Sequence, residues 1–403
     1  MAVNLTEPTA LNPVAGIRLA PVAAGIRYRN RDDLLLMEIA PGATTAAVFT
    51  QNAFCAAPVI VAREHLAREQ PGYLLINAGN ANAGTGLEGI EAARAACAAV
   101  ARATGCAPAA VLPFSTGVIG EPLPIDRIAA AIPAALSGLS ADNWPAAMRS
   151  IMTTDTVGKG CSRRFTWNGR EATITGIAKG SGMIRPDMAT MLAFIATDAV
   201  VPEPVLRATL ASVVEETFNC ITVDGDTSTN DALVVVATGR SGLVAAAGEA
   251  LDVFRATLLE VCLFLAQAIV RDGEGATKFI AVTVTGADDR EEARRAAFTV
   301  AHSPLVKTAL FASDPNWGRI LAAVGRAGID RLDVSRVTIA IGGVRIVEGG
   351  GRAASYTEEA GQRAMRESEI QIGIDLGRGG ASATVWTCDF SFEYVRINAE
   401  YRS

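Results

Sequence analysis

Histidine is scarce in this chain of 403 residues, which has only His65 and His302 to supply an imidazole. Neither residue stands beside a serine or cysteine in a recognisable motif, so a Ser-His-Asp triad has little support. His302 follows a charged helical stretch and is most simply a residue at a helix end. If a hydroxyl group acts as nucleophile in this protein, its base must come from another kind of group.

Paired cysteines are also missing, because the seven cysteines are scattered, include no C-x-x-C pair and are odd in number. We expect reduced and mostly buried thiols, as in a cytoplasmic protein. The seven are Cys55, Cys97, Cys106, Cys161, Cys220, Cys262 and Cys388.

Charge is sparse as well. Charged residues make up 19% of the chain and the formal net charge is -6, which argues against a nucleic-acid partner.

Residues 1–8 lack the basic start and apolar run of a secretory signal. The longest apolar segment, residues 251–270, is interrupted by Asp252, Arg255 and Glu260, so we predict a buried or amphipathic helix and not a membrane span. We expect a soluble, cytoplasmic protein.

Nucleotide and metal motifs are absent too. The chain has neither a Rossmann G-x-G-x-x-G nor a Walker G-x-x-x-x-G-K-S/T pattern, so nucleotide use has no sequence support. The run from Asp224 resembles a calcium loop in its first positions. However, Thr229 stands where that loop needs glycine and Val235 where it needs glutamate. We therefore predict no metal and no resident cofactor.

Apolar content, by contrast, is high. Half of the residues are hydrophobic, and the length suffices for two domains or one large one. Apolar runs typical of strands, such as residues 34–39, alternate with helical patterns, such as the alanine-rich residues 88–104. We predict an α/β protein in which helices cover sheets. The short run Val59 to Val61 is predicted as a further strand.

One stretch, residues 178–192, reads A-K-G-S-G-M-I-R-P-D-M-A-T-M-L and separates two predicted strands, residues 172–177 and 191–196. Glycine and proline make it a loop that turns sharply. Thr190 stands at the mouth of the second strand, after the small residue Ala189. A cut between Ala189 and Thr190 would make Thr190 an N-terminal nucleophile, whereas an ordinary loop is the alternative that the pattern alone leaves open.

Two other segments are candidates for contact with the substrate. Residues 115–120 read S-T-G-V-I-G, and a strand that ends in a Thr-Gly turn presents N–H groups and a hydroxyl where a developing oxyanion needs them. A plain turn is the alternative. Residues 77–86, rich in Gly, Ala and Asn, are expected to form a tight turn where backbones approach closely, or a substrate contact.

Three polar positions have a simple structural interpretation beside a functional one. The run T-T-D-T at residues 153–156 is typical of a cap cluster at the end of an element. Glu274 lies in a Gly-rich segment, residues 271–278, where a carboxylate is usually solvated, and Lys179 beside the Gly-rich loop could be solvated in the same way. In their functional interpretation, Lys179 and Glu274 bind charged groups of a substrate, a charge-assisted contact.

The run K-G-S-G-M-I-x-P-x-M-A-T-M-L resembles the signature of the ornithine acetyltransferase family, the glutamate N-acetyltransferases of arginine biosynthesis. Further blocks similar to the family lie along nearly the whole chain. The resemblance implies a layered αββα-type sandwich with two lobes and self-cleavage before the threonine. Residues 1–189 would then be an α chain and residues 190–403 a β chain. An α2β2 heterotetramer is the assembly that it implies.

The resemblance also implies roles for individual residues. It assigns the nucleophile to Thr190, the cleavage site to Ala189 and Thr190, and the oxyanion hole to Thr116 and Gly117. The positions that it assigns to substrate binding are Thr153, Lys179, Thr190, Glu274, Asn398 and Ser403. Lys179 would then receive a substrate carboxylate and Glu274 the substrate's α-ammonium group. Because the last two lie in the C-terminal tail, we expect this tail to be ordered.

An N-terminal threonine would supply the base that histidine does not, because its own α-amine has a reference pKa of about 7.7 to 8.0. Before cleavage the same nitrogen is an amide, so cleavage creates the catalyst. Thr190 would take the acetyl group of N-acetylornithine and pass it to glutamate in a ping-pong cycle, yielding ornithine and N-acetylglutamate. Whether acetyl-CoA also serves as co-substrate stays open.

Two alternatives remain from the residues alone. An N-terminal nucleophile aminopeptidase or amidase would use the same threonine with water as the acceptor. A non-catalytic binding protein would leave the bond between Ala189 and Thr190 intact.

Overall fold

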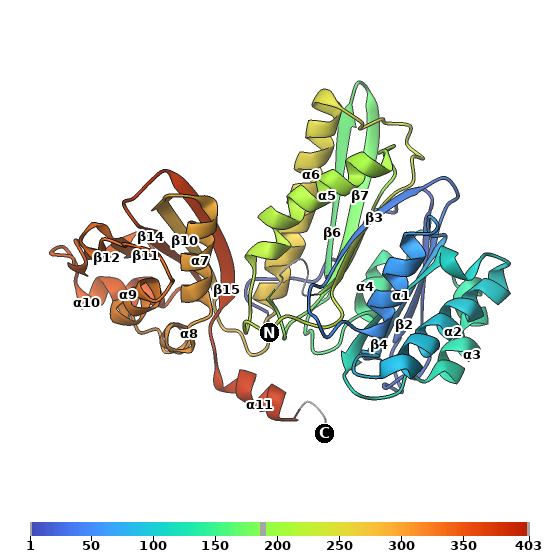
Figure 1. Cartoon of the computed structure of the whole chain (residues 1–403), viewed down its shortest axis with the longest axis horizontal. Coiled ribbons are helices and arrows are strands. Elements are labelled where there is room, and N and C mark those ends of the chain that lie inside the picture. Colours follow the sequence, from blue (N-terminus) through green and yellow to red (C-terminus); the bar gives the residue numbers. More distant parts are fainter. Residues whose placement is uncertain (1, 186–190, 401–403) are drawn as a thin grey trace.

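The chain folds into two lobes that lie side by side in a computed structural model describing residues 2–185 and 191–400 (Figure 1). The first lobe is built around two sheets and the second around one. The last helix, α11 (Phe392–Glu400), leaves the second lobe and runs beneath the molecule toward the first lobe.

Two sheets face each other in the first lobe. The five-stranded sheet has the order β3 (Thr44–Phe49), β9 (Ala232–Ala237), β8 (Leu192–Thr197), β7 (Arg170–Lys179) and β6 (Lys159–Trp167). The four-stranded sheet has the order β1 (Ile17–Val22), β2 (Leu34–Ile39), β4 (Tyr73–Asn80) and β5 (Val111–Val118). The inner faces of both sheets share one apolar core, in which the rings of Phe114 and Phe194 meet edge to face with centroids 5.1 Å apart.

Helices cover the outer faces of both sheets. On the five-stranded sheet these are α5 (Glu203–Glu216) and α6 (Gly248–Arg271), and on the four-stranded sheet α2 (Gly86–Thr104) and α3 (Ile125–Ser137). The shorter helices of this lobe are α1 (Ala57–Leu66) and α4 (Trp144–Ser150), and its 3-10 turns are Pro108–Ala110 and Phe218–Cys220. The layers therefore follow the order αββα, which confirms the predicted α/β fold class.

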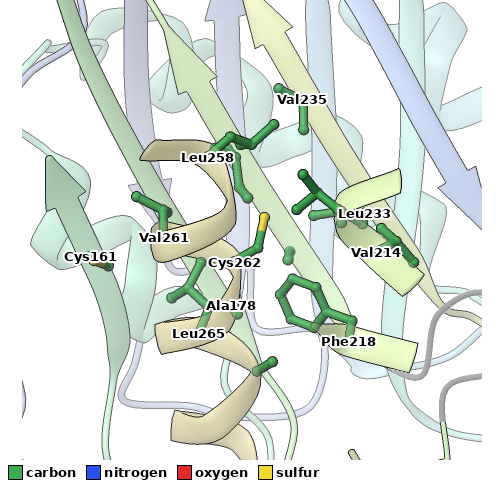
Figure 2. Close-up of a cluster of buried hydrophobic side chains, with 14 of the residues drawn as sticks. Cys161, Ala178, Val214, Phe218, Leu233, Val235, Leu258, Val261, Cys262 and Leu265 are labelled. Carbon is green, nitrogen blue, oxygen red and sulfur yellow. The ribbon is translucent and has the colours of Figure 1, made fainter. Parts of the chain in front are cut away.

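Helix α6 shows why the apolar pattern of residues 251–270 belongs to a core helix. Figure 2 shows Leu258, Val261 and Cys262 of α6 in one buried cluster with Leu233 and Val235 of the sheet. Among the described residues α6 is also the one helix long and apolar enough to cross a membrane, by length and composition alone. Its apolar side is occupied by the sheet, as expected of a helix that covers a β-layer.

The second lobe has its own sheet and its own core. The sheet has the order β13 (Gly351–Arg352), β12 (Val344–Glu348), β11 (Thr338–Ile341), β14 (Glu369–Asp375), β10 (Phe279–Ala287) and β15 (Ala381–Cys388). The helices around it are α7 (Arg290–Ala301), α8 (Pro304–Phe311), α9 (Trp317–Gly325) and α10 (Glu358–Met365), with a 3-10 turn at Val334–Arg336. The separate core agrees with the predicted division into two lobes.

The predicted strand from Val59 to Val61 is wrong. These residues lie in α1, which begins at Ala57 and has Pro58 in its first turn, a position where proline favours a helix. Val59, Val61 and His65 are buried on the same helix. A short apolar β-branched run cannot by itself distinguish a strand from a buried helical face.

Candidate active site

A cavity of about 280 Å³ between the first lobe and α11 brings together residues that are far apart in the sequence. Its lining includes six of the residues predicted to act in catalysis or substrate binding: Thr116, Gly117, Thr153, Lys179, Glu274 and Asn398. The other predicted positions, Ala189, Thr190 and Ser403, lie outside the described residues. We take this cavity as the candidate active site.

Thr116 and Gly117 lie in β5, next to the parallel strand β4, and not in a turn after the strand as predicted. The pairing is irregular there, with a register shift at Asn80. Gly117 has a φ of +134°, and a Cβ on it would lie 2.2 Å from the carbonyl carbon of Gly79 and 2.5 Å from the nitrogen of Asn80. Only glycine permits this approach, which agrees with the close backbone contact expected for residues 77–86. The turn predicted for that segment is shorter than expected, because residues 77–80 belong to β4 and α2 begins at Gly86.

Asn230 joins β5 to the loop that precedes β9. Its side-chain amide donates to the carbonyl oxygens of Ala81 (2.6 Å) and Ser115 (2.9 Å), and its own oxygen accepts from the hydroxyl of Thr229 (2.6 Å). Ser228, Thr229 and Asn230 all line the cavity. Sequence reasoning considered this block only as a calcium loop and rejected it, although a run of hydroxyl and amide side chains directly before an apolar strand was a usable signal.

Lys179 ends β7 and is buried at the cavity. Burial lowers the pKa of its ammonium group, while the carboxylates of Asp155, Asp231 and Glu274 oppose this effect and the charge of Lys159 adds to it. A lysine buried at a cavity wall can bind an anionic group there, and such a group would favour the charged form of the lysine.

Glu274 lies opposite as a buried carboxylate with 7% of its surface exposed. Its backbone N–H donates to the carbonyl oxygen of Ser181 (2.8 Å), and the amide of Asn398 donates to its Oε2 (2.8 Å). The carboxylate sits directly over Gly182, because a Cβ there would lie 2.5 Å from it. Neither the pairing with Asn398 nor the constraint at Gly182 is visible in the sequence.

The threonines of the predicted cap cluster line the cavity from another side. The backbone N–H of Thr153 donates to Oδ2 of Asp155 (3.0 Å), and the hydroxyl of Thr154 is 2.7 Å from that of Ser181. Both threonines face the cavity, and their loop is held by a carboxylate as a cap cluster requires.

Asp231 is a further buried carboxyl group that sequence reasoning did not single out. It is 2% exposed, and its Oδ2 has no hydrogen-bond partner in the part of the chain that the structure describes. Burial raises the pKa of Asp231 well above its usual range, although Ser228, Lys179 and the N–H of Met191 act in the opposite direction. The charged form of this carboxyl group, close to the start of β8, therefore costs more free energy than that of an exposed aspartate.

Comparison with known proteins identifies the family. A sequence profile described as the ArgJ family matches residues 18–403. This chain belongs to the ArgJ family. The arginine biosynthesis bifunctional protein ArgJ of Pseudomonas syringae pv. tomato is 55% identical over the full length of both chains. That of Methylococcus capsulatus is 58% identical over 99% of this chain and 98% of its own.

A solved structure described as the arginine biosynthesis bifunctional protein argJ of Bacillus halodurans is 38% identical. It matches 51% of this ArgJ chain and 96% of its own, with a TM-score of 0.49. Together, the family match and the full-length relatives confirm the predicted membership in the ornithine acetyltransferase family.

Proposed function

We propose that this ArgJ enzyme transfers the acetyl group of N-acetylornithine to glutamate, and that it also acetylates glutamate from acetyl-CoA. The first activity makes it a glutamate N-acetyltransferase and the second an amino-acid N-acetyltransferase of arginine biosynthesis. The full-length relatives support both activities, because they are named as bifunctional proteins of this pathway. The alternative of an aminopeptidase or amidase is not favoured by these relatives.

The observation that carries the proposal is that a buried lysine and a buried carboxylate line the same cavity. Lys179 and Glu274 can receive a substrate carboxylate and a substrate ammonium group, the two charged groups of an amino acid. Thr153 and Asn398 lie close enough to the cavity to add hydrogen bonds. Donor and acceptor are both amino-acid derivatives, so one site can serve them in turn.

The proposed chemistry begins at Thr190. Its hydroxyl oxygen attacks the acetyl carbonyl carbon while its free α-amine takes the hydroxyl proton. The oxyanion forms beside Thr116 and Gly117, the bond from carbon to the ornithine nitrogen breaks, and the proton passes to that nitrogen. The amine of glutamate then attacks the acetyl ester and releases N-acetylglutamate, which restores the hydroxyl group. No histidine is needed.

A Thr190→Ala variant tests the nucleophile. We expect it to remain one chain of 41.8 kDa on denaturing mass analysis and to transfer no acetyl group, because it lacks the hydroxyl for both steps. Thr190→Ser keeps a hydroxyl and an α-amine and serves as the control that should still be cleaved. Normal processing and transfer by Thr190→Ala would overturn the proposal.

The proposed oxyanion hole at Thr116 and Gly117 can be tested separately in cleaved enzyme. Thr116→Ala removes one hydroxyl donor and should lower kcat about a hundredfold, or roughly 3 kcal/mol, with little change in KM. Unchanged turnover would remove Thr116 from the proposed mechanism. Measuring free acetate beside N-acetylglutamate in the same assay separates transfer from the hydrolysis that an amidase would perform.

Assembly and location are part of the proposal as well. The chain is proposed to act as an α2β2 heterotetramer of residues 1–189 and 190–403 in the cytoplasm. Native mass spectrometry of the purified protein should show two copies of each cleaved chain. Full-length chains alone, or one copy of each, would contradict it.

A further inference from the structure

Three charged side chains form a buried array behind the candidate active site. The ammonium group of Lys159 lies 2.7 Å from Oδ1 of Asp155 and 2.6 Å from Oδ2 of Asp272. The side chains of all three residues are 0 to 1% exposed. Removing charges from water is costly, and a buried array of this kind needs a compensating set of contacts.

Those contacts lead directly to the cavity. Asp155 accepts from the N–H of Thr153 at Oδ2 (3.0 Å) and from the N–H of Gly180 at Oδ1 (2.7 Å). Thr153 lines the cavity, and Gly180 directly follows Lys179 in the chain. One carboxylate therefore fixes two separate segments that each carry a candidate substrate-binding residue.

The other end of the array lies beside Glu274. Asp272 follows α6 and stands two residues before Glu274. It accepts from the N–H of Thr156 (2.9 Å) and from the hydroxyl of the same residue. Asp155 and Lys159 belong to residues 1–189 and Asp272 to residues 190–403, so the array spans the proposed cleavage products.

We infer that Asp155 is a positioning residue that places Thr153 and Lys179 for substrate binding, and that Lys159 and Asp272 hold it there. The inference rests on the proposed function, because it assigns the array to that same site. Asp155 acts on the substrate only through the residues that it orients, and Lys159 acts only through Asp155.

The pKa of Lys179 provides a measurable quantity that a purely structural role of the array would leave unchanged. The titratable groups that act on Lys179 are Asp155, Asp231 and Glu274, which favour its ammonium form, and Lys159, which disfavours it. Loss of Asp155 should therefore lower the pKa of Lys179, and loss of Lys159 should raise it. If charged Lys179 binds the substrate carboxylate, the alkaline limb of kcat/KM follows these changes.

The experiment compares Asp155→Asn and Lys159→Met in the cleaved enzyme. For Asp155→Asn we expect the alkaline limb of kcat/KM for N-acetylornithine to move to lower pH by about one unit or more. For Lys159→Met we expect it to move to higher pH. KM should rise about tenfold or more in both variants, because Thr153 and Lys179 lose their fixed positions.

Lys307→Met is the matched control, because Lys307 is also a lysine with 1% exposure but lies in the second lobe, bonded to the hydroxyl of Thr387 (2.9 Å). It should lose stability and keep the wild-type pH profile. The inference would be overturned if the alkaline limb of kcat/KM stayed in place in Asp155→Asn and Lys159→Met, or if it moved in the same direction in both variants.

Two further outcomes are distinguishable. If Asp155→Asn does not fold or is not cleaved, the comparison of Lys159→Met with Lys307→Met decides the question by itself. If the wild-type enzyme does not transfer acetyl groups from N-acetylornithine to glutamate, the proposed function fails. If it does so and the limbs do not move, only the role of the array fails.

Discussion

A carboxylate placed over a glycine controls one side of the candidate active site. Glu274 approaches Gly182 so closely that no side chain fits between them, and the amide of Asn398 donates to Oε2 of Glu274. The position of this carboxylate thus depends on the absence of a single methyl group.

Gly182→Ala tests this dependence. The added Cβ would lie 2.5 Å from the carboxylate and must displace it, so we expect KM for N-acetylornithine to rise about tenfold while the melting temperature changes little. Steady-state kinetics and thermal unfolding measure the two effects. Gly380→Ala, where an added Cβ would meet nothing within 4 Å and φ is likewise not positive, is the control for a glycine-to-alanine change without this clash. An unchanged KM in Gly182→Ala would show that Glu274 does not contact the substrate.

At this scale the resemblance to the family carried the prediction. The residue types alone left an ordinary turn or a solvated side chain open at Thr116, Lys179 and Glu274, which do share a cavity. Asp155 and Asp231 could not be singled out, because a carboxylate in a polar loop looks the same in the sequence whether it is solvated or buried. Their burial depends on packing between segments that are distant along the chain.

At the scale of elements, α11 joins the end of the chain to the first lobe. None of its residues is buried, yet Asn398 reaches Glu274 and the hydroxyl of Tyr394 reaches Asp224 (3.4 Å). Its Phe392 and Val395 are 84% and 66% exposed. The helix therefore contributes far more to the site than to the core.

Removal of α11 should separate these contributions. A chain ending at Ser391 should lose little stability, because the helix buries no residue, but its KM for N-acetylornithine should rise about tenfold or more. Asn398→Ala is the milder variant and should raise KM by a smaller factor with the helix intact. Thermal unfolding and kinetics of the cleaved proteins check both. A truncated enzyme with normal KM would exclude the tail from the site.

Helices and strands were predictable to the extent that their patterns were regular. Residues 34–39 and 369–374 have clear strand patterns and form β2 and most of β14. Strand β6 was missed because its sequence, K-G-C-S-R-R-F-T-W, mixes charges with small residues, as an edge strand permits. Its place is set by pairing with β7, which the local sequence does not encode.

At the scale of the whole molecule, a charged contact joins the two lobes. Arg271, at the end of α6, binds Glu369 at the start of β14 (2.7 Å), and its guanidinium lies 4.0 Å from the ring centroid of Phe279. The hydrogen bond from Arg271, followed by that from Asn4, lowers the pKa of Glu369 from 4.5 to about 2. A carboxylate with a lowered pKa stabilises the fold above its unfolded pKa and loses this effect as the pH falls.

Glu369→Gln should therefore reduce the melting temperature slightly at pH 7 and leave it unchanged relative to wild type near pH 2. The effect is small because the carboxylate is 46% exposed and screened by solvent. Thermal unfolding from pH 7 down to pH 2 measures it. The control is Glu393→Gln, an exposed partner of Arg396 on α11 that lies outside the contact between the lobes. A difference that persisted at the lowest pH would contradict the assignment.

The arrangement of β7 and β8 bears on how a precursor could mature. The two strands are antiparallel neighbours in the middle of a sheet, paired from Ile174 and Thr197 to Lys179 and Leu192. Scission between residues 189 and 190 would sever their linker but none of these ladder bonds. The two polypeptides would still contribute neighbouring strands to the same sheet, so cleavage would require no refolding. We therefore expect the products to separate only under denaturing conditions.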